Sequence, residues 1–190
     1  ADEGDSEAQY YLELIQKAGY RDKTTYKDGK AAYLKNDFKL AFEILKPLAD
    51  NGDSWSQYVL SLMYESGQGV EKNQEESVKW LILAAESGVP KIQYDLGIRY
   101  FYGYGIEQNY DEAAKWWESS ANAGIADSQY NLGLMYYRGI GVSKDKNKAR
   151  ILIKKAASQA HDKAQHRLAM IYALDDEDFL TSLSWLRESA

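Results

Sequence analysis

The chain has 190 residues, of which 45% are hydrophobic and 27% charged, so it can bury a sizeable core and lacks the composition of a disordered chain. Its net charge of −6 argues against a nucleic-acid partner, because phosphate binding requires a clustered basic surface. It contains no cysteine and therefore no disulfide framework. The longest apolar run, residues 80–85, is too short to insert across a membrane.

A Gln-Tyr pair recurs along the chain at a fixed interval of 36 residues. It stands at Gln57-Tyr58, Gln93-Tyr94 and Gln129-Tyr130, with Gln165-His166 as an altered fourth copy. Self-similarity at this period predicts an architecture of stacked repeats. Such stacks usually present a surface and seldom build a buried catalytic pocket.

The repeat divides the chain into six consecutive units of a single solenoid. They are a partial unit at 1–22, a short unit at 23–52, three 36-residue units at 53–88, 89–124 and 125–160, and a short final unit at 161–190. Residues 1–12 match residues 49–60 almost position for position. We therefore expect the sequence to be a piece of a longer solenoid.

Each full unit is predicted to be a helix hairpin. In the first one, Gln57, Leu60, Ser61 and Tyr64 follow the i, i+3, i+4, i+7 spacing of one helix face. The small residue on that face (Ser61, Gly97, Gly133) permits close approach of the second helix. The second helix should turn its own large residues (Trp80, Trp116, Leu152) toward the first helix. A Gly-x-Gly loop separates the two helices and allows positive φ. We expect Asn73, Asn109 and Asp145 to cap the second helices.

The repeated pattern resembles the Sel-one-like repeat family, a branch of the tetratricopeptide-related α-solenoids. The resemblance rests on the Gln-Tyr pair, the Gly-x-Gly loop and the Ala-x-x-Trp-x-x-x-Ala-Ala segment, and it covers nearly the whole chain. It implies a right-handed superhelix of antiparallel helix pairs that acts as an adaptor or scaffold. Some family members carry a disulfide in each repeat. This chain has none, so its hairpins must rest on packing alone.

A second stripe of large side chains runs along the predicted first helices. In tetratricopeptide-like stacks this stripe faces the concave surface. Its aliphatic members (Leu62, Ile98, Leu134, Met170) are expected to pack between repeats. Its aromatic members are candidates for a partner-binding groove, because rigid aromatic side chains bind peptides at low entropic cost. They are Trp55, Tyr58, Tyr94, Phe101, Tyr130 and Tyr137.

Three patterns in the sequence could indicate other chemistry. His161 and His166 are five residues apart and do not share a helix face, so no metal site is predicted. The acidic run at 175–178 lacks the spacing of a calcium loop. Ser143 to Lys146 matches the Ser-x-x-Lys motif of penicillin-recognising enzymes, and some cysteine-rich relatives are described as penicillin-binding, but no companion motif accompanies it here.

The sequence thus predicts an all-α solenoid that binds a protein or peptide partner without catalysis, cofactor or metal, as a monomer. Two alternatives stay open, a penicillin-recognising enzyme and a structural spacer within a longer repeat protein. The sequence does not identify the partner or the compartment, although the family resemblance favours a bacterial periplasmic or secreted location.

Overall fold

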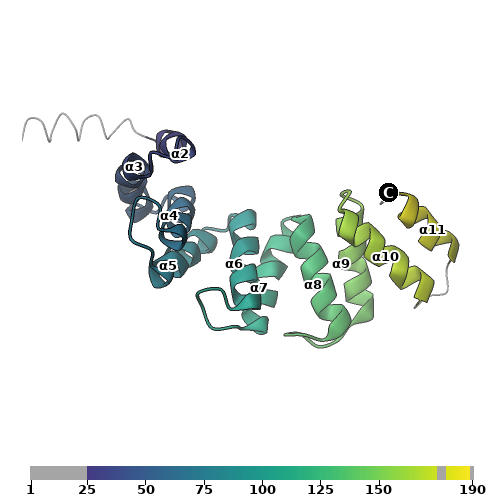
Figure 1. The fold of residues 1–190 in the computed structure, drawn as a ribbon. Helices are drawn as coiled ribbons and strands as arrows, with labels where there is room; N and C mark the ends of the chain where they lie inside the picture. The colour runs from purple at the N-terminus through teal and green to yellow at the C-terminus, as the bar shows by residue number, and fades with distance from the viewer. Residues whose placement is uncertain (1–24, 175–178, 189–190) are drawn as a thin grey trace, which may run out of the picture. The chain divides into compact units, whose positions relative to one another are not determined.

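The computed structural model describes residues 25–174 and 179–188, which form helices joined by turns and include no β-strand. The expected all-α class is therefore confirmed for this part of the chain. The helices belong to two compact units, residues 1–84 and 85–190, and each is described separately (Figure 1). The expected partial unit at 1–22 and the acidic run at 175–178 lie outside the described residues.

The first unit contains a short hairpin followed by the first 36-residue hairpin. Its helices are α2 (Tyr26–Leu34), α3 (Phe38–Asp50), α4 (Ser54–Ser66) and α5 (Gln74–Glu86), the last of which ends just beyond the unit boundary. A tight turn at residues 35–37, with φ of 61° at Asn36, joins α2 to α3. The core of the unit is built around the fully buried side chains of Leu45, Leu60 and Met63.

The second unit contains three further hairpins. Its helices are α6 (Pro90–Tyr102), α7 (Tyr110–Asn122), α8 (Ala126–Arg138), α9 (Lys146–Ala157), α10 (Asp162–Leu174) and α11 (Phe179–Glu188). Each helix packs against the helix before and after it in this unit, so α7 contacts both α6 and α8, and α9 contacts both α8 and α10 (Figure 1). This neighbour-to-neighbour packing is the arrangement expected of a repeat stack.

The glutamine of each Gln-Tyr pair links one hairpin to the helix before it. The side-chain Nε2 of Gln57 donates to the carbonyl of Ala49 at 3.0 Å, and Gln129 donates to that of Ala121 at 3.1 Å. Gln93 and Gln165 make the same contact, at 3.4 Å, with Ala85 and Ala157. These carbonyls lie in the last turn of a helix, and each also accepts the backbone N–H three residues further on, as Ala121 does from Gly124 at 3.0 Å. The repeated glutamine therefore adds a second donor to the helix end and ties it to the next hairpin.

Small residues let the two helices of a hairpin approach closely, as predicted. A Cβ at Gly97 would lie 2.4 Å from Cδ1 and Nε1 of Trp117, and a Cβ at Gly133 would lie 2.7 Å from Cγ1 of Ile153. The residue at the Gly97 contact is Trp117, which the sequence analysis did not name; Trp116, which it turned toward the first helix, is half-buried. Adjacent helical residues point about 100° apart, so only one of two neighbouring tryptophans can lie beneath the glycine.

The loops of the three full hairpins have the backbone that their glycines predict. All six loop glycines have positive φ, between 63° and 75°. At Gly141 a Cβ would also lie 2.6 Å from the backbone of Tyr110 in the preceding hairpin. Side-chain oxygens of Asn73, Asn109 and Asp145 accept backbone hydrogen bonds at 2.9–3.1 Å, which confirms these three helix caps.

Candidate functional site

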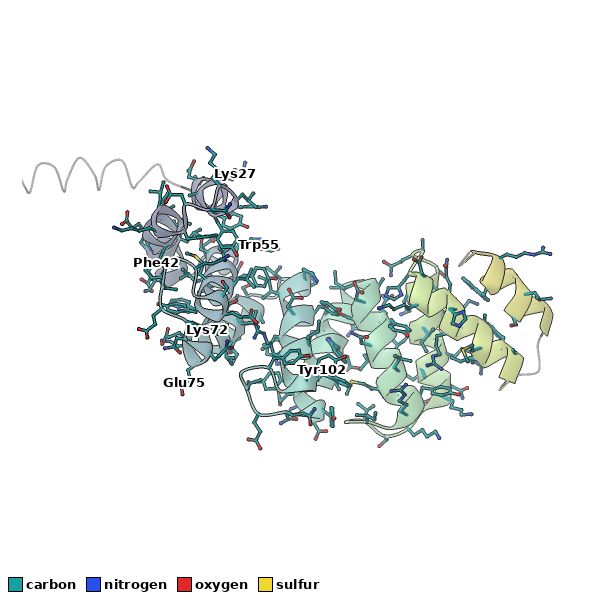
Figure 2. The ribbon with its side chains drawn as sticks, in the orientation of Figure 1. Lys27, Phe42, Trp55, Lys72, Glu75 and Tyr102 are labelled. Atoms are coloured by element: carbon teal, nitrogen blue, oxygen red, sulfur yellow. The ribbon has the colours of Figure 1, made fainter. Side chains whose placement is uncertain are left out.

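Trp55 and Tyr58 are the two predicted binding residues in the first unit, and both belong to α4. Trp55 is 39% exposed, and its side chain is visible on the surface of the unit in Figure 2. Its ring lies 6.1 Å from that of Tyr58 and 6.3 Å from that of Tyr26, measured between centroids. Tyr58 is half-buried. The structure thus gathers three aromatic rings from α2 and α4 into one cluster.

The other four predicted residues lie on α6 and α8 of the second unit. Tyr94 and Phe101 pack against the buried cluster that contains Trp117 and Leu132. Tyr130 and Tyr137 pack against the next cluster, around Ile153 and Leu168. All four are half-buried. Each side chain therefore covers core residues with part of its surface and leaves the rest accessible to solvent.

Tyr94 is held in a polar environment between α6 and α8. The Nζ of Lys91 lies 4.3 Å from its ring centroid, and Lys91 also forms an ion pair with Asp95 at 3.2 Å. Burial raises the pKa of the Tyr94 hydroxyl, the charges of Asp127 and Asp95 raise it further, and a hydrogen bond with Asn131 opposes them. The hydroxyl is therefore protonated at neutral pH and available as a hydrogen-bond donor.

A first hollow, of about 140 Å³, lies between α6 and α8. Its lining residues are Phe101, Tyr102, Trp117, Asn131, Leu134, Met135, Arg138 and Ile140. The rings of Phe101 and Trp117 lie 5.2 Å apart at an angle of 31°. Pockets for drug-sized molecules measure about 300–1,000 Å³, so a hollow of this size fits a single side chain of a partner better than a cofactor.

Two exposed tyrosines beside this hollow were missed by the sequence analysis. Tyr102, at the end of α6 (Figure 2), is 57% exposed, and Tyr104 in the following loop is 55% exposed. Their rings are stacked, with centroids 5.2 Å apart and an angle of 19°. The equivalent positions are Ser66 and Gln68 in the first full copy and Arg138 and Ile140 in the third. This departure from the repeat was the signal that could have revealed them.

A second, wider hollow of about 380 Å³ lies between α8 and α10. Its lining residues are Tyr130, Asp162, Lys163, His166, Arg167 and Met170. Met170 was expected to pack between repeats, but it is 39% exposed and lines this hollow. Because the hollows are lined by α6 with α8 and by α8 with α10, these three helices share one surface. We call it the first-helix surface.

His161 supports one edge of the second hollow. Its ring lies 5.0 Å from that of Tyr130, and its Nε2 lies 3.3 Å from a carboxylate oxygen of Asp127. Its Nδ1 accepts a hydrogen bond from the backbone N–H of Ala164 at 3.1 Å. Both ring nitrogens therefore have protein partners. Across the described residues, histidines and carboxylates form no group of three that could hold a metal ion.

The Ser-x-x-Lys match has an unremarkable place in the structure. Ser143 is exposed in the loop before α9. Lys146, the first residue of α9, lies with its Nζ 5.5 Å from the ring centroid of Tyr137. Asp145 between them caps the helix. The motif thus coincides with a helix start.

None of the helices described is long and apolar enough to cross a membrane.

A Sel1 repeat model matches residues 25–53, 56–89, 90–125, 126–161 and 162–190. A comparison with curated proteins finds no match. Among solved structures, a Sel1 repeat protein from Oxalobacter formigenes is 28% identical, with a TM-score of 0.74 over 80% of this chain. This chain spans 62% of the Oxalobacter protein.

Two more distant structures share the fold. Helicobacter pylori cysteine rich protein B is 22% identical, with a TM-score of 0.50 over 75% of this chain and 96% of its own. The immunity protein Pa5087 from Pseudomonas aeruginosa is 21% identical, with a TM-score of 0.51 over 85% of this chain and 64% of its own. The family model covers far more than half of the sequence, and the helical hairpins agree with it. This chain belongs to the Sel1 repeat family.

Proposed function

We propose that this protein is a non-enzymatic scaffold that binds a partner protein or peptide through its first-helix surface and its exposed aromatic side chains. Sel1 repeat proteins are typically protein-interaction scaffolds and generally non-catalytic, which supports the general class. The particular surface is our proposal. The observation that carries it is the row of half-buried aromatic rings on α6 and α8, continued by the exposed pair Tyr102 and Tyr104.

The exposed pair supports binding more strongly than the half-buried rings do. Tyr94 and Tyr130 pack against core clusters, so packing alone gives them a role. Tyr102 and Tyr104 are mostly exposed, and other copies of the repeat fold with polar or aliphatic residues at the same positions. Packing of the hairpin therefore does not require tyrosine there. Tyrosine is enriched among residues that dominate binding energy, because it buries a large area with few rotatable bonds.

The test is a paired measurement of stability and binding on single alanine variants. Tyr94→Ala, Tyr130→Ala and Tyr104→Ala are compared with Ile151→Ala, a control that removes an exposed apolar side chain from α9. A partner is first isolated from a source lysate on the immobilised wild-type protein and identified. Its affinity for each variant is then measured by calorimetry, and the melting temperature of each variant is measured by circular dichroism.

Truncating a tyrosine that contributes strongly to binding should weaken the binding free energy by about 2 kcal/mol, which is roughly 30-fold in affinity. Tyr104→Ala should do so while changing the stability by about 0.5 kcal/mol or less, because its side chain is mostly exposed. Ile151→Ala should change neither quantity. If the three tyrosine variants lower the melting temperature but keep full affinity, the tyrosines serve packing alone and the proposed surface is wrong.

The enzymatic alternative has a separate test. A penicillin-recognising enzyme would be acylated at Ser143 by a labelled β-lactam, and Ser143→Ala would abolish the label. We expect no covalent label on the wild-type protein, because Ser143 lies in an exposed loop and Lys146 lies over the ring of Tyr137. Stoichiometric acylation at Ser143 would overturn the non-enzymatic assignment.

A further inference from the structure

The second hollow differs from the rest of the first-helix surface in its charge. Lys163 and Arg167 line it and are four residues apart on α10, so they are neighbours on the same helix face. Among the described residues, neither has an ion pair or a hydrogen bond to its side chain. Arg167 is half-buried. An unpaired guanidinium in a partly enclosed site is unusual, because removing a charge from water costs free energy unless a partner compensates it.

Comparison with α6 shows that this charge arrangement is not a requirement of the repeat. The positions equivalent to Lys163 and Arg167 are Lys91 and Asp95, which form an ion pair at 3.2 Å. In α10 the second member is a cation, so the two side chains repel each other and destabilise the helix slightly. Natural sequences tend to break a local rule of this kind at functional sites. An anionic group placed between the two cations would relieve the repulsion.

Other groups around the hollow leave room for such an anion. Asp162 also lines it and partly offsets the two cations. Asp127, at the edge, lies against the ring of His161. Tyr130 and Met170 supply an aromatic and an apolar wall. The hollow therefore combines a positively charged pair with an apolar wall, which matches a segment that carries a carboxylate next to an apolar side chain.

We propose that the second hollow binds an acidic segment of the partner protein, with an internal aspartate or glutamate carboxylate between Lys163 and Arg167 and a neighbouring apolar side chain against Tyr130 and Met170. This inference rests on the proposed function and states the chemistry of its partner. We favour an internal side chain over a chain terminus, because the first hollow, on α6 and α8, belongs to the same first-helix surface. A partner segment that occupies both hollows must pass through the second one and not end in it. Arginine suits this role because its planar guanidinium can donate two parallel hydrogen bonds to one carboxylate.

The experiment uses the whole chain and three synthetic peptides of equal length. The first alternates glutamate and leucine and has both ends blocked. The second carries glutamine in place of glutamate, and the third is the glutamine peptide with a free carboxyl terminus. Binding is followed at low salt by amide chemical-shift changes in the ¹⁵N-labelled protein, which also show where each peptide binds. We expect the glutamate peptide to shift amides at the start of α10 and to bind about tenfold or more tightly than the glutamine peptide.

The matched variants are Lys163→Gln, Arg167→Gln and the control Lys154→Gln, which removes an exposed cation from α9. Each of the first two should weaken the glutamate peptide about fivefold or more, while the control should change it less than twofold. Lys163 is exposed, so its variant keeps the test valid if Arg167→Gln lowers the stability. The amide spectrum of each variant verifies that it is folded.

Three results with the blocked peptides would overturn the inference, and a fourth concerns the peptide with a free carboxyl terminus. The first is that the glutamate and glutamine peptides bind with equal affinity. The second is that Lys154→Gln weakens the glutamate peptide as much as Lys163→Gln and Arg167→Gln do. The third is that millimolar glutamate peptide shifts no amide signal of α10. Tight binding of the glutamine peptide with a free carboxyl terminus would show that the hollow accepts a chain end, which also contradicts the proposal. The proposed function is tested separately by the tyrosine variants. Failure of the acidic-segment proposal with intact tyrosine effects would therefore refute this inference alone.

Discussion

The contact between Gly97 and Trp117 allows a prediction in which two opposing effects must be compared. Replacing Gly97 with alanine in the middle of α6 should stabilise the helix by about 0.8–1.0 kcal/mol on propensity alone. The added Cβ, however, would lie 2.4 Å from Cδ1 and Nε1 of Trp117, an indole that is 2% exposed. The indole Nε1 also donates to the carbonyl of Tyr94 at 3.1 Å, so the ring cannot move away without losing this bond.

The packing effect should outweigh the propensity effect. Overpacking of a core typically costs about 1–3 kcal/mol, and a lost hydrogen bond that leaves a buried group unpaired costs about 1–3 kcal/mol more. After subtraction of the helix gain, Gly97→Ala should destabilise the protein by roughly 1–5 kcal/mol. For a chain of this size each kcal/mol lowers the melting temperature by about 2–4 °C. Denaturant unfolding followed by circular dichroism at 222 nm measures the difference.

A double-mutant cycle identifies the cause. The equivalent positions in the first full copy hold Ser61 and Leu81, both of which are buried. Trp117→Leu should therefore make room for a side chain at position 97, and the double variant should be more stable than the sum of the single changes predicts, by about 1 kcal/mol or more. If Gly97→Ala is as stable as the wild type or more stable, helix propensity dominates and the close-packing argument is refuted.

Three further predictions concern the loops, the core and the titration of a tyrosine. Gly141→Ala should cost clearly more than Gly88→Ala in urea unfolding, because both have positive φ but only Gly141 has backbone atoms of the preceding hairpin within 2.6 Å of the new Cβ; equal costs would contradict this. Leu132→Ala should cost about 2–5 kcal/mol as a truncation of a buried side chain, whereas Ile151→Ala, at an exposed position, should stay within about 0.5 kcal/mol. The raised pKa of Tyr94 means that the unfolded state loses this proton first, so its stabilising contribution is complete below pH 10 and declines as the pH rises through the folded-state pKa; Tyr94→Phe should flatten the stability curve above pH 10, and an unchanged curve would argue against the shift.

Features that depend on a few neighbouring residues were predictable from the sequence. The 36-residue period predicted helix hairpins, the loop glycines predicted positive φ, and Asn73, Asn109 and Asp145 predicted helix caps, and the structure confirms each of these. Each is decided by backbone geometry within one turn or loop, and the repetition of the pattern reinforced the signal. The repeated local pattern also allowed the helices that form the first-helix surface to be predicted.

Features that depend on how closely two helices approach were decided only by the tertiary structure. The sequence pattern named Trp116 as the residue that faces the first helix, but Trp117 is the one that contacts Gly97 and is buried. The repeated glutamine was recognised as a marker, yet its bond to a carbonyl of the preceding helix appears only when the hairpins are stacked. Likewise, the two hollows arise from the spacing between neighbouring first helices. A local sequence pattern determines which way a helix face points, but the distance to its neighbour depends on side-chain volumes from distant parts of the chain.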